Sequence, residues 1–297
     1  MPTSVTANTQ PRKDLKRQEY LEMYRLAYRN ILLDLARAGY DTSTYDAVEA
    51  SELDRWIESE LFSMRYETYQ AMPSKLDILV NPLHHVRSGE EKKTSTEGFG
   101  PEASSVIQWR AHWKEMIHLK VDDESEIPPR IYVHFACFPE TTVFKEKHFM
   151  AVMNNLHETC GVNSKDTVVI VTQNDANENE LIFSRKIHYH KLNEITSQTE
   201  GNFVIFLQIL ELQYDLQSHR FAPPSRVLHC KREWTHKLKT VAHIEDPIEE
   251  LPEMDVDDAH MVRLFAKPRQ IIESMSCSEN ELNQRKYYVI NYKEQNY

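Results

Sequence analysis

Acidic and basic residues of the types used by metal-dependent nucleases lie near the first predicted strand. Asp77 lies in an apolar segment at 76–80, and the Glu-x-Lys pattern Glu91-Lys92-Lys93 follows it. In such enzymes two carboxylates hold Mg²⁺ and a lysine steadies the attacking water. The Glu-x-Lys pattern, however, lies in a charged, aperiodic segment where no sheet would fix its position. Nuclease activity is therefore retained only as an alternative.

Two further groups of side chains have types that bind metals or bases. His188 and His190 are spaced like the first ligands of a zinc site, but no cysteine or carboxylate lies at ligand spacing beside them. We interpret them as a solvated or partner-facing helix end and predict no metal site. A second group would stack on bases, although its spacing is more typical of a packed amphipathic segment. It consists of Trp109, His112, Trp113 and His118.

Motifs of other enzyme classes are missing from the sequence. It has six glycines and neither a G-x-S-x-G elbow nor the phosphate loops G-x-x-x-x-G-K-[ST] and G-x-G-x-x-G. Cys160, directly before Gly161, is more typical of a buried or helix-end thiol than of a nucleophile. The cysteines form no C-x-x-C pair, which favours reduced thiols. We predict no cofactor and no catalytic residue.

The charge balance bears on nucleic-acid binding. The chain has a formal net charge of -11 and a pI near 5.7. Sequence-independent affinity for DNA requires Lys and Arg to neutralise phosphates, so this balance argues against an autonomous nucleic-acid binder. One basic cluster has two interpretations: it contacts nucleic acid, or it is only the solvated start of a helix. It consists of Arg12, Lys13, Lys16 and Arg17.

Hydropathy indicates a soluble protein. No apolar run approaches the ~20 residues that a membrane helix requires. Residues 1–9 are polar and lack the apolar core of a secretory signal. We therefore expect neither a membrane span nor a cleaved leader.

The sequence pattern of the N-terminal part predicts helices. We expect a disordered tail at 1–12 and a helix at 15–37, where apolar residues recur at helical spacing and Gly39 marks the end. A second helix is predicted at 45–70, with Pro73 after it. These helices would position the strand that contains Asp77.

The middle of the chain alternates between strand and helix patterns. Apolar runs predict strands at 131–136, 167–172 and 203–206, and helices are predicted between them at 142–159 and 181–190. Such alternation is typical of βαβ units with a mainly parallel, two-sided sheet. Because its run is β-branched throughout, the strand at Thr167 is expected at the centre of the sheet.

Two domains are expected for a chain of 297 residues. The first, 13–217, contains a charged insertion at 87–105 that we expect to be mobile, and its last strand is predicted at 212–216. The second, 218–297, begins with a turn and a short helix at 231–238. The predicted fold class is α/β, or α+β taken as a whole: N-terminal helices with a mainly parallel sheet, then a small mixed domain.

The last quarter of the chain carries the most specific order of features. These are a turn at 219–224, a Leu-Pro-Glu-Met step at 251–254, the acidic pair Asp257-Asp258, an apolar pair after Gln270, a Ser278-Glu279 turn and a strand-like run at 287–292. In that order they resemble a small assembly domain of RNA polymerases. In archaea this domain is a separate polymerase subunit, and in eukaryotes it is the C-terminal half of the fifth-largest subunit, which the nuclear RNA polymerases share.

The first domain is similar to the N-terminal jaw domain of that eukaryotic subunit. Residues 24–32, followed by Ala38-Gly39-Tyr40, resemble its opening helix and turn. Residues 129–135, followed by a helix and the strand at 167–172, resemble its central sheet.

The chain departs from the family around the last turn. The family has an Asp-Pro, an Ala-Arg-Tyr and a Lys-Arg-Gly-Gln run, where this chain has Asp258-Ala259, 261–263 and Pro268-Arg269-Gln270. Because a residue with a Cβ is disfavoured at positive φ, we expect the turn before Ile271 to use a different backbone conformation.

The resemblance implies a non-catalytic structural subunit of a multisubunit DNA-directed RNA polymerase. The second domain would dock on the largest subunit, among other polymerase subunits, and the jaw domain would lie near downstream DNA only within that complex. The implied interface residues are His219, Pro223, Pro224, Gln270, Ile271, Ser278, Glu279, Tyr287 and Tyr288. Gln173 and Asn174 match the loop that the family places near DNA, although the acidic residues that follow them would repel phosphate.

The same resemblance implies where in the cell the protein is found. We expect the nucleus for a cellular protein, and a cytoplasmic viral factory or a virion if a large DNA virus encodes it. The divergence from the family suggests such a virus. A free-standing transcription adaptor is the alternative from another class.

Overall fold

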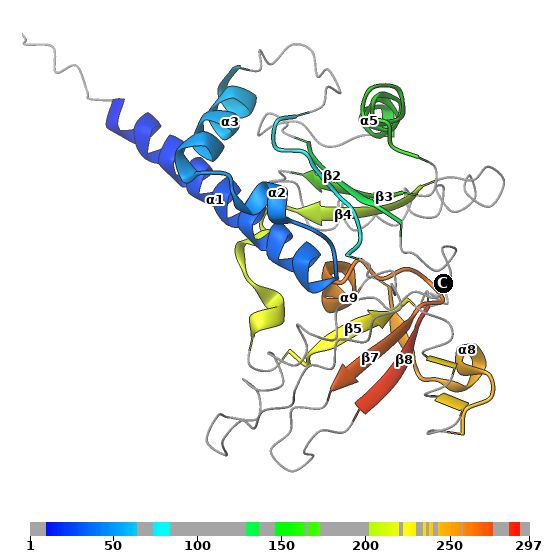
Figure 1. Cartoon of the computed structure of the whole chain (residues 1–297). Coiled ribbons are helices and arrows are strands. Elements are labelled where there is room, and N and C mark those ends of the chain that lie inside the picture. Colours follow the sequence, from blue (N-terminus) through cyan, green and yellow to red (C-terminus); the bar gives the residue numbers. More distant parts are fainter. Residues whose placement is uncertain are drawn as a thin grey trace, which may run out of the picture. The chain divides into compact units, whose positions relative to one another are not determined.

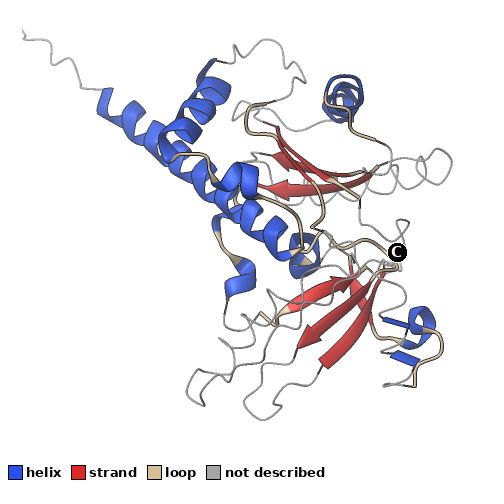
Figure 2. Ribbon diagram, viewed as in Figure 1, coloured by secondary structure: helices blue, strands red, loops and turns tan. Residues whose placement is uncertain are grey.

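A computed structural model describes most of the predicted elements and shows a mixed α/β protein with two four-stranded sheets (Figures 1 and 2). This confirms the mixed class. The described residues are 10–63, 74–83, 129–136, 146–163, 166–172, 202–219, 222–229, 234–235, 238–239, 243–256, 258–275 and 285–291.

The chain divides into two compact units. The first comprises Met1–Leu32, Ser43–Leu79 and Ile131–Tyr214, and the second comprises Leu33–Thr42, Val80–Arg130 and Asp215–Tyr297. The predicted domain boundary near Ser218 stays a prediction.

Helix α1 spans Gln10–Arg37 and contributes residues to both units. Its start differs from the prediction, because residues 10–12 are helical and do not belong to a disordered tail; residues 1–9 lie outside the described part. Its end agrees with the prediction: Gly39 has a φ of 90°, and the Tyr40 N–H donates to the Leu35 carbonyl at 3.0 Å. A glycine at this position satisfies the last carbonyls of a helix without strain.

The single helix predicted at 45–70 is two helices, α2 at Ser43–Asp46 and α3 at Ala50–Ser63. Turn hydrogen bonds between them, such as the Val48 N–H to the Tyr45 carbonyl at 3.2 Å, interrupt the helical pattern. Residues 64–70 lie outside the described part. Ion pairs join α3 to α1: Arg17 contacts Glu58 at 2.6 Å and Arg25 contacts Asp54 at 2.6 Å.

The first unit contains a sheet of four strands in chain order. Strand β2 pairs in parallel with β3, and β3 pairs in parallel with β4, which confirms the predicted parallel arrangement. Every residue of β2 and β3 is buried, because these strands are interior and covered on both faces. The strands are β1 (Ile78–Val80), β2 (Ile131–Ala136), β3 (Thr167–Thr172) and β4 (Phe203–Gln208).

Helices lie on both faces of this sheet (Figure 1). On one face, Tyr132 and Val168 pack against Leu156 of α5, which spans Glu146–Thr159. On the other face, the Phe135 ring lies 5.9 Å from that of Tyr28 in α1, centroid to centroid. The predicted helix at 181–190 and the insertion at 87–105 lie outside the described part.

The prediction of a strand at 212–216 is wrong. Two short 3₁₀ helices replace it, η2 at Glu211–Gln213 and η3 at Leu216–Ser218. Local hydrogen bonds explain the difference: the Asp215 side chain accepts from the Ser218 N–H at 3.1 Å, and the Asn30 amide donates to the Leu212 carbonyl at 2.8 Å. The apolar alternation therefore reflects successive turns, with Leu212 buried and Tyr214 75% exposed.

The second unit has a mixed sheet in the order β5-β7-β8-β6. Strands β7 and β8 are the expected terminal pair and are antiparallel, with Ile271 opposite Val289. Two short helices, α8 (Pro247–Glu250) and α9 (Ala259–Arg263), connect parts of this unit. The strands are β5 (Ser225–Leu228), β6 (Glu253–Asp255), β7 (Ile271–Met275) and β8 (Arg285–Asn291).

This unit has its own apolar core. The row Leu228, Ile271 and Val289 crosses three strands and packs with Leu238 and Leu251. Most of the helix predicted at 231–238 lies outside the described part.

Candidate functional site

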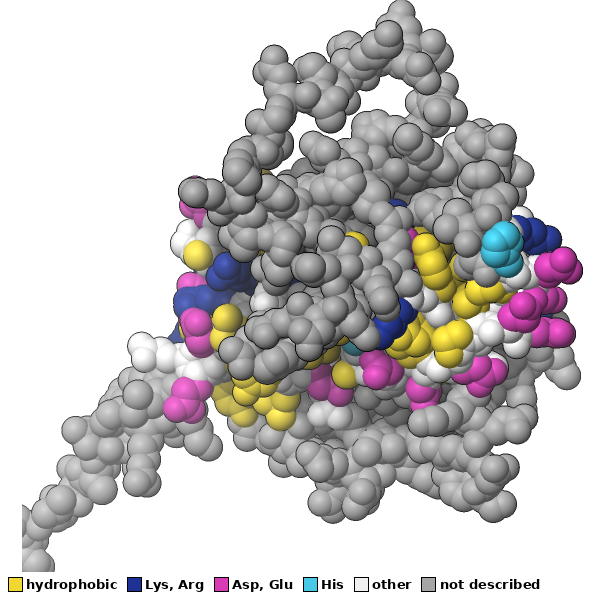
Figure 3. All heavy atoms as spheres, turned by 90° about the horizontal axis from the view of Figure 1, so that it is seen from below, with side chains coloured by type: hydrophobic (Ala, Val, Ile, Leu, Met, Phe, Trp, Pro, Cys, Tyr) yellow, Lys and Arg dark blue, Asp and Glu magenta, His cyan; other side chains and the backbone are white. Residues whose placement is uncertain are grey.

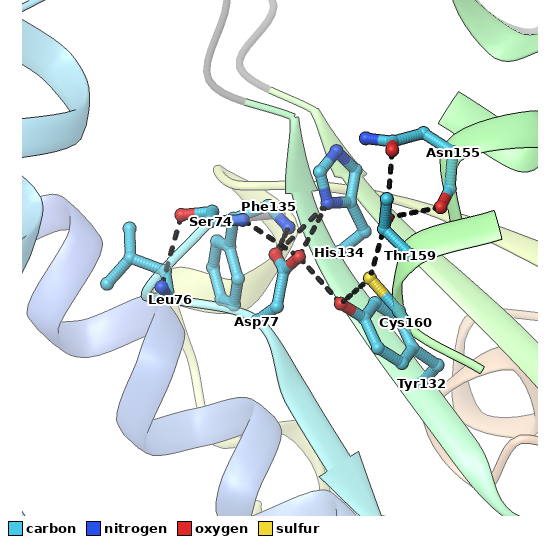
Figure 4. Close-up of polar contacts among 9 residues, drawn as sticks. All are labelled: Ser74, Leu76, Asp77, Tyr132, His134, Phe135, Asn155, Thr159 and Cys160. Atoms are coloured by element: carbon cyan, nitrogen blue, oxygen red, sulfur yellow. Dashed lines mark hydrogen bonds and ion pairs between the residues drawn. The ribbon is translucent and has the colours of Figure 1, made fainter. Parts of the chain in front are cut away.

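The buried carboxylate of Asp77 is the centre of a hydrogen-bonded cluster in the first unit (Figure 4). It lies just before β1 and accepts from the backbone N–H groups of Ser74 at 3.0 Å and Phe135 at 3.1 Å. The Tyr132 hydroxyl contacts it at 2.9 Å and His134 Nδ1 lies 3.0 Å from both of its oxygens. Groups from one strand, β2, and from the turn before β1 therefore surround this side chain.

This geometry is that of a structural carboxylate. Both oxygens of Asp77 already accept hydrogen bonds, so a metal ion would have to displace donors that the fold holds in place. No group of three or more His, Cys, Asp or Glu within the described ranges is arranged to hold a metal ion. The other half of the nuclease hypothesis, Glu91-Lys92-Lys93, lies outside the described part.

The cluster continues to Cys160, at the end of α5. The Tyr132 hydroxyl lies 3.3 Å from Cys160 Sγ, and the Thr159 hydroxyl lies 3.6 Å from it. Burial raises the pKa of Tyr132, and the neighbouring Asp77 raises it further. A hydroxyl that is this weak an acid holds its own proton, and no imidazole contacts the sulfur in the described part. Cys160 is a half-buried free thiol directly after the last residue of α5, which agrees with the helix-end position of the prediction.

The Tyr45 hydroxyl hydrogen-bonds with backbone groups at the outer edge of β1, the strand that follows Asp77. It accepts from the Leu79 N–H at 2.8 Å and contacts the Leu79 carbonyl at 3.2 Å. Such a side chain takes the place of a neighbouring strand. Nothing in the sequence pattern indicates this pairing, because Tyr45 and Leu79 are 34 positions apart.

In the second unit, an ion pair missed by sequence reasoning links α1 to α9. The carboxylate of Asp34 accepts from the Arg263 guanidinium, and both side chains are buried. Burial raises the pKa of Asp34 to about 6, although Arg263 acts in the opposite direction. Nearby, the Asp215 carboxylate contacts Arg37 at 2.7 Å, which lowers the pKa of Asp215.

The segment from Asp258 to Gln270 contains two left-handed residues. Phe265 has a φ of 54° and follows Leu264, the residue that caps the end of α9. The Ala266 N–H donates to the Met261 carbonyl at 3.2 Å, and the Phe265 N–H donates to the Val262 carbonyl at 3.1 Å. This is the hydrogen-bond pattern of a helix end that normally carries glycine.

The turn before Ile271 contains the other left-handed residue. Arg269 has a φ of 66°. The expectation of a different backbone conformation is therefore wrong, since the turn keeps the conformation that favours glycine and accepts the cost of a Cβ.

The predicted interface residues have different surroundings. Ile271 is 1% exposed and lies within the core of the second unit, and its role at an interface stays a prediction. Tyr287 is half-buried, and its hydroxyl donates to Glu273 at 3.1 Å. Glu273 also contacts Arg226 at 2.6 Å, so this tyrosine belongs to an internal polar row.

Other predicted interface residues lie on or near the surface. His219 and Pro223 are exposed, and Pro224 is half-buried. Tyr288 is half-buried on the face of the sheet opposite Tyr287, and its hydroxyl has no hydrogen bond among the described residues. The Gln270 side chain accepts from the Lys267 N–H at 2.7 Å and so stabilises its own turn. Ser278 and Glu279 lie outside the described part.

The residues predicted near DNA lie only partly within the described residues, and their role stays a prediction. Arg17 is paired with Glu58 of α3. Arg12, Lys13 and Lys16 lie on α1, but their side chains are outside the described set. Gln173 and Asn174 lie outside the described part, as do His188, His190 and the Trp109, His112, Trp113 and His118 group.

The described surface agrees with an acidic chain. Figure 3 shows acidic side chains spread over the described part of one face, next to apolar ones. No helix within the described ranges has both the length and the apolar character to cross a bilayer.

Comparisons with known proteins add no relative. No family model matches the chain, and no curated protein sequence matches it significantly.

Proposed function

We propose that this chain is a non-catalytic subunit of a multisubunit DNA-directed RNA polymerase, whose C-terminal part docks on the largest subunit. The observation that carries the proposal is the segment from Asp258 to Ile272. Asp258 caps α9 by accepting from the His260 N–H at 2.9 Å, a left-handed residue ends that helix, and a second left-handed residue precedes β7.

This conformation supports the resemblance where the sequence departs from it. Arg269 stands at the glycine of the family's Lys-Arg-Gly-Gln run, and its φ of 66° is one that glycine adopts without strain. A backbone that keeps such a conformation after the glycine is lost fits a common ancestral turn. The separate core around Leu228, Ile271 and Val289 further supports a small assembly module.

The first unit fits a structural role. Its best-placed carboxylate, Asp77, is saturated by hydrogen bonds, and Cys160 contacts hydroxyls and no base among the described residues. A non-catalytic subunit needs rigid cores and exposed contact residues and no reactive group. Tyr288, half-buried with an unused hydroxyl among the described residues, is such a contact residue.

Co-purification tests the proposal. The full chain carrying a tag, expressed in its native source, is expected to recover the two largest polymerase subunits at near-stoichiometric yield in moderate salt. Recovery of a transcription factor without either large subunit would favour the free-standing adaptor. Recovery of neither would exclude the proposed function.

DNA binding by the isolated chain provides a second test. With a net charge of -11, the purified protein is expected to bind duplex DNA only weakly at physiological salt. Sub-micromolar binding in a fluorescence anisotropy titration would contradict a subunit that meets DNA only inside a complex.

A further inference from the structure

Strand β5 lies at one edge of the second sheet, beside β7 (Figure 1). Directly before β5, the Pro224 carbonyl accepts from the Met275 N–H at 2.9 Å. Because hydrogen-bonded pairs alternate along an antiparallel ladder, the residues of β5 bond to β7 at every second position from Pro224 onward. Ser225 and Val227 lie between these positions, so their N–H and C=O groups point away from the sheet.

These outward backbone groups are unpaired within the described part of the chain. Neither Ser225 nor Val227 makes a backbone hydrogen bond to any described residue on this side of the strand. The Ser225 hydroxyl does not cover the edge, because it donates to the Pro223 carbonyl at 2.9 Å and contacts the Ser274 hydroxyl at 3.0 Å. The edge therefore presents donors and acceptors at alternate residues.

Two other sheet edges of this protein are closed to an added strand. At β1 the Tyr45 hydroxyl occupies the outward N–H and C=O groups of Leu79. Strand β6 has only three residues, and two of them are acidic. The single charged residue of β5 is Arg226, and its guanidinium contacts Glu273 at 2.7 Å. Strand β5 therefore lacks the features that close β1 and β6.

An apolar row of side chains ends at this edge. Val227 lies opposite Ile272 of β7, which lies opposite Tyr288 of β8. Ile272 is fully buried, whereas Val227 and Tyr288 are half-buried. A further strand would place a side chain beside Val227, and an apolar residue there would extend the row.

We propose that β5 binds an extended, non-acidic segment of a partner protein, which adds to the second sheet as a further strand. Unpaired N–H and C=O groups at alternate residues are complementary to an extended backbone and not to a helix or a phosphate. The net charge of -11 disfavours both an acidic segment and a second copy of this chain. This inference rests on the proposed function, in which the partner is the largest polymerase subunit.

Val227→Pro tests the outward N–H directly. Proline removes this donor and places its ring toward the incoming strand, but it breaks no hydrogen bond to β7. Val227→Ala is the matched control, since it shortens the same side chain and keeps the donor. Two quantities are measured on the tagged full chain: the thermal midpoint after purification, and the yield of the two largest polymerase subunits in moderate salt.

The two variants are expected to differ in binding and not in stability. Val227→Pro should lower the yield of the large subunits about ten-fold, whereas Val227→Ala should retain it within about two-fold. Their thermal midpoints should lie within about 3 °C of each other.

Hydrogen exchange of the wild type tests the edge without any variant. In the isolated chain the Val227 amide should exchange at least about ten-fold faster than the Ile272 amide of the interior strand β7, and it should slow about ten-fold in the recovered complex. Protection of Val227 in the dilute isolated chain would overturn the proposal, because the edge would already be covered. Protection that rises with the concentration of the isolated chain would identify a second copy and contradict a partner protein.

The outcomes separate this inference from the proposed function. Full recovery of both large subunits by Val227→Pro would overturn strand addition at β5 and leave the subunit assignment intact. Failure of the wild type to recover either subunit would overturn the proposed function and this inference together.

Discussion

Each unit of this protein buries a carboxylate, and the two carboxylates are stabilised in different ways. Asp77 in the first unit is contacted by two backbone N–H groups, a hydroxyl and an imidazole. Asp34 in the second unit depends on the guanidinium of Arg263, and its Oδ1 has no hydrogen bond among the described residues. Several donors distributed over a turn and a strand tolerate the loss of one member, whereas removal of one partner of a buried ion pair leaves a charge buried without its counter-charge.

The largest effect is expected from breaking the buried ion pair. Asp34→Ala leaves the Arg263 guanidinium buried without its carboxylate and should lower the free energy of unfolding by about 3–5 kcal/mol. Urea denaturation of the full chain measures the change.

A double variant sharpens this result. Asp34→Leu combined with Arg263→Met replaces the pair by apolar groups and should recover most of the lost stability, because no charge remains buried alone. A double variant as unstable as Asp34→Ala would show that the ion pair stabilises the folded state by more than the cost of burying its two charges.

A smaller effect is expected at Asp77. Asp77→Asn keeps the shape but replaces one acceptor oxygen by an N–H₂ group that faces donors, so the free energy of unfolding should fall by about 2 kcal/mol. The same variant tests the nuclease alternative: DNA nicking by the wild type with Mg²⁺ that disappears in Asp77→Asn would contradict a purely structural carboxylate. Equal unfolding curves for variant and wild type would contradict the hydrogen-bonded cluster.

The two carboxylates should also differ in their response to pH. The pKa of Asp34 is raised to about 6 in the folded state, above its unfolded value of 3.8. The folded state therefore holds this proton more firmly, and the contribution of Asp34 to stability is largest below pH 3.8 and is lost as the pH rises to 6.

Thermal unfolding between about pH 4 and pH 7 measures this contribution. In Asp34→Asn this group no longer titrates, so the loss of stability between these two pH values should be smaller than in the wild type by about 2–3 kcal/mol. An identical pH dependence in wild type and Asp34→Asn would exclude a raised pKa.

The smallest effect is expected at the strand that follows Asp77. Tyr45→Phe removes the hydroxyl that contacts the N–H and the carbonyl of Leu79 and should cost about 1 kcal/mol. Hydrogen exchange at the Leu79 amide should accelerate more than at interior strand residues such as Val169. Unchanged exchange at Leu79 would indicate that another group takes the place of the hydroxyl.

The sequence predicted the parts of the fold in which neighbouring residues decide the structure. Strands β2 and β3 have the predicted ends, because their short runs of mainly apolar β-branched and aromatic residues are typical of a strand covered on both faces. The end of α1 was likewise predictable from Gly39. The pattern at 212–216 failed because an alternation over so few residues fits turns as well as a strand.

The candidate sites could be predicted only in part. Asp77 was identified from its residue type and its place beside a strand, but its role depended on Tyr132, His134 and Phe135, which are 55 to 58 positions away. The conformation of Arg269 was predicted wrongly, because local preference favours glycine there and the hydrogen bonds with Ile290 and Lys267 impose the left-handed backbone.

The sequence by itself determined the acidic charge, the mixed class and the order of strands and helices, since these depend on composition and on the spacing of apolar residues. Only the tertiary structure decided which polar groups are paired: Asp34 with Arg263, Asp77 with its donors, and Tyr45 with Leu79. The physical reason is that burial makes an unpaired polar group costly, and the partner that removes this cost lies far away in the sequence.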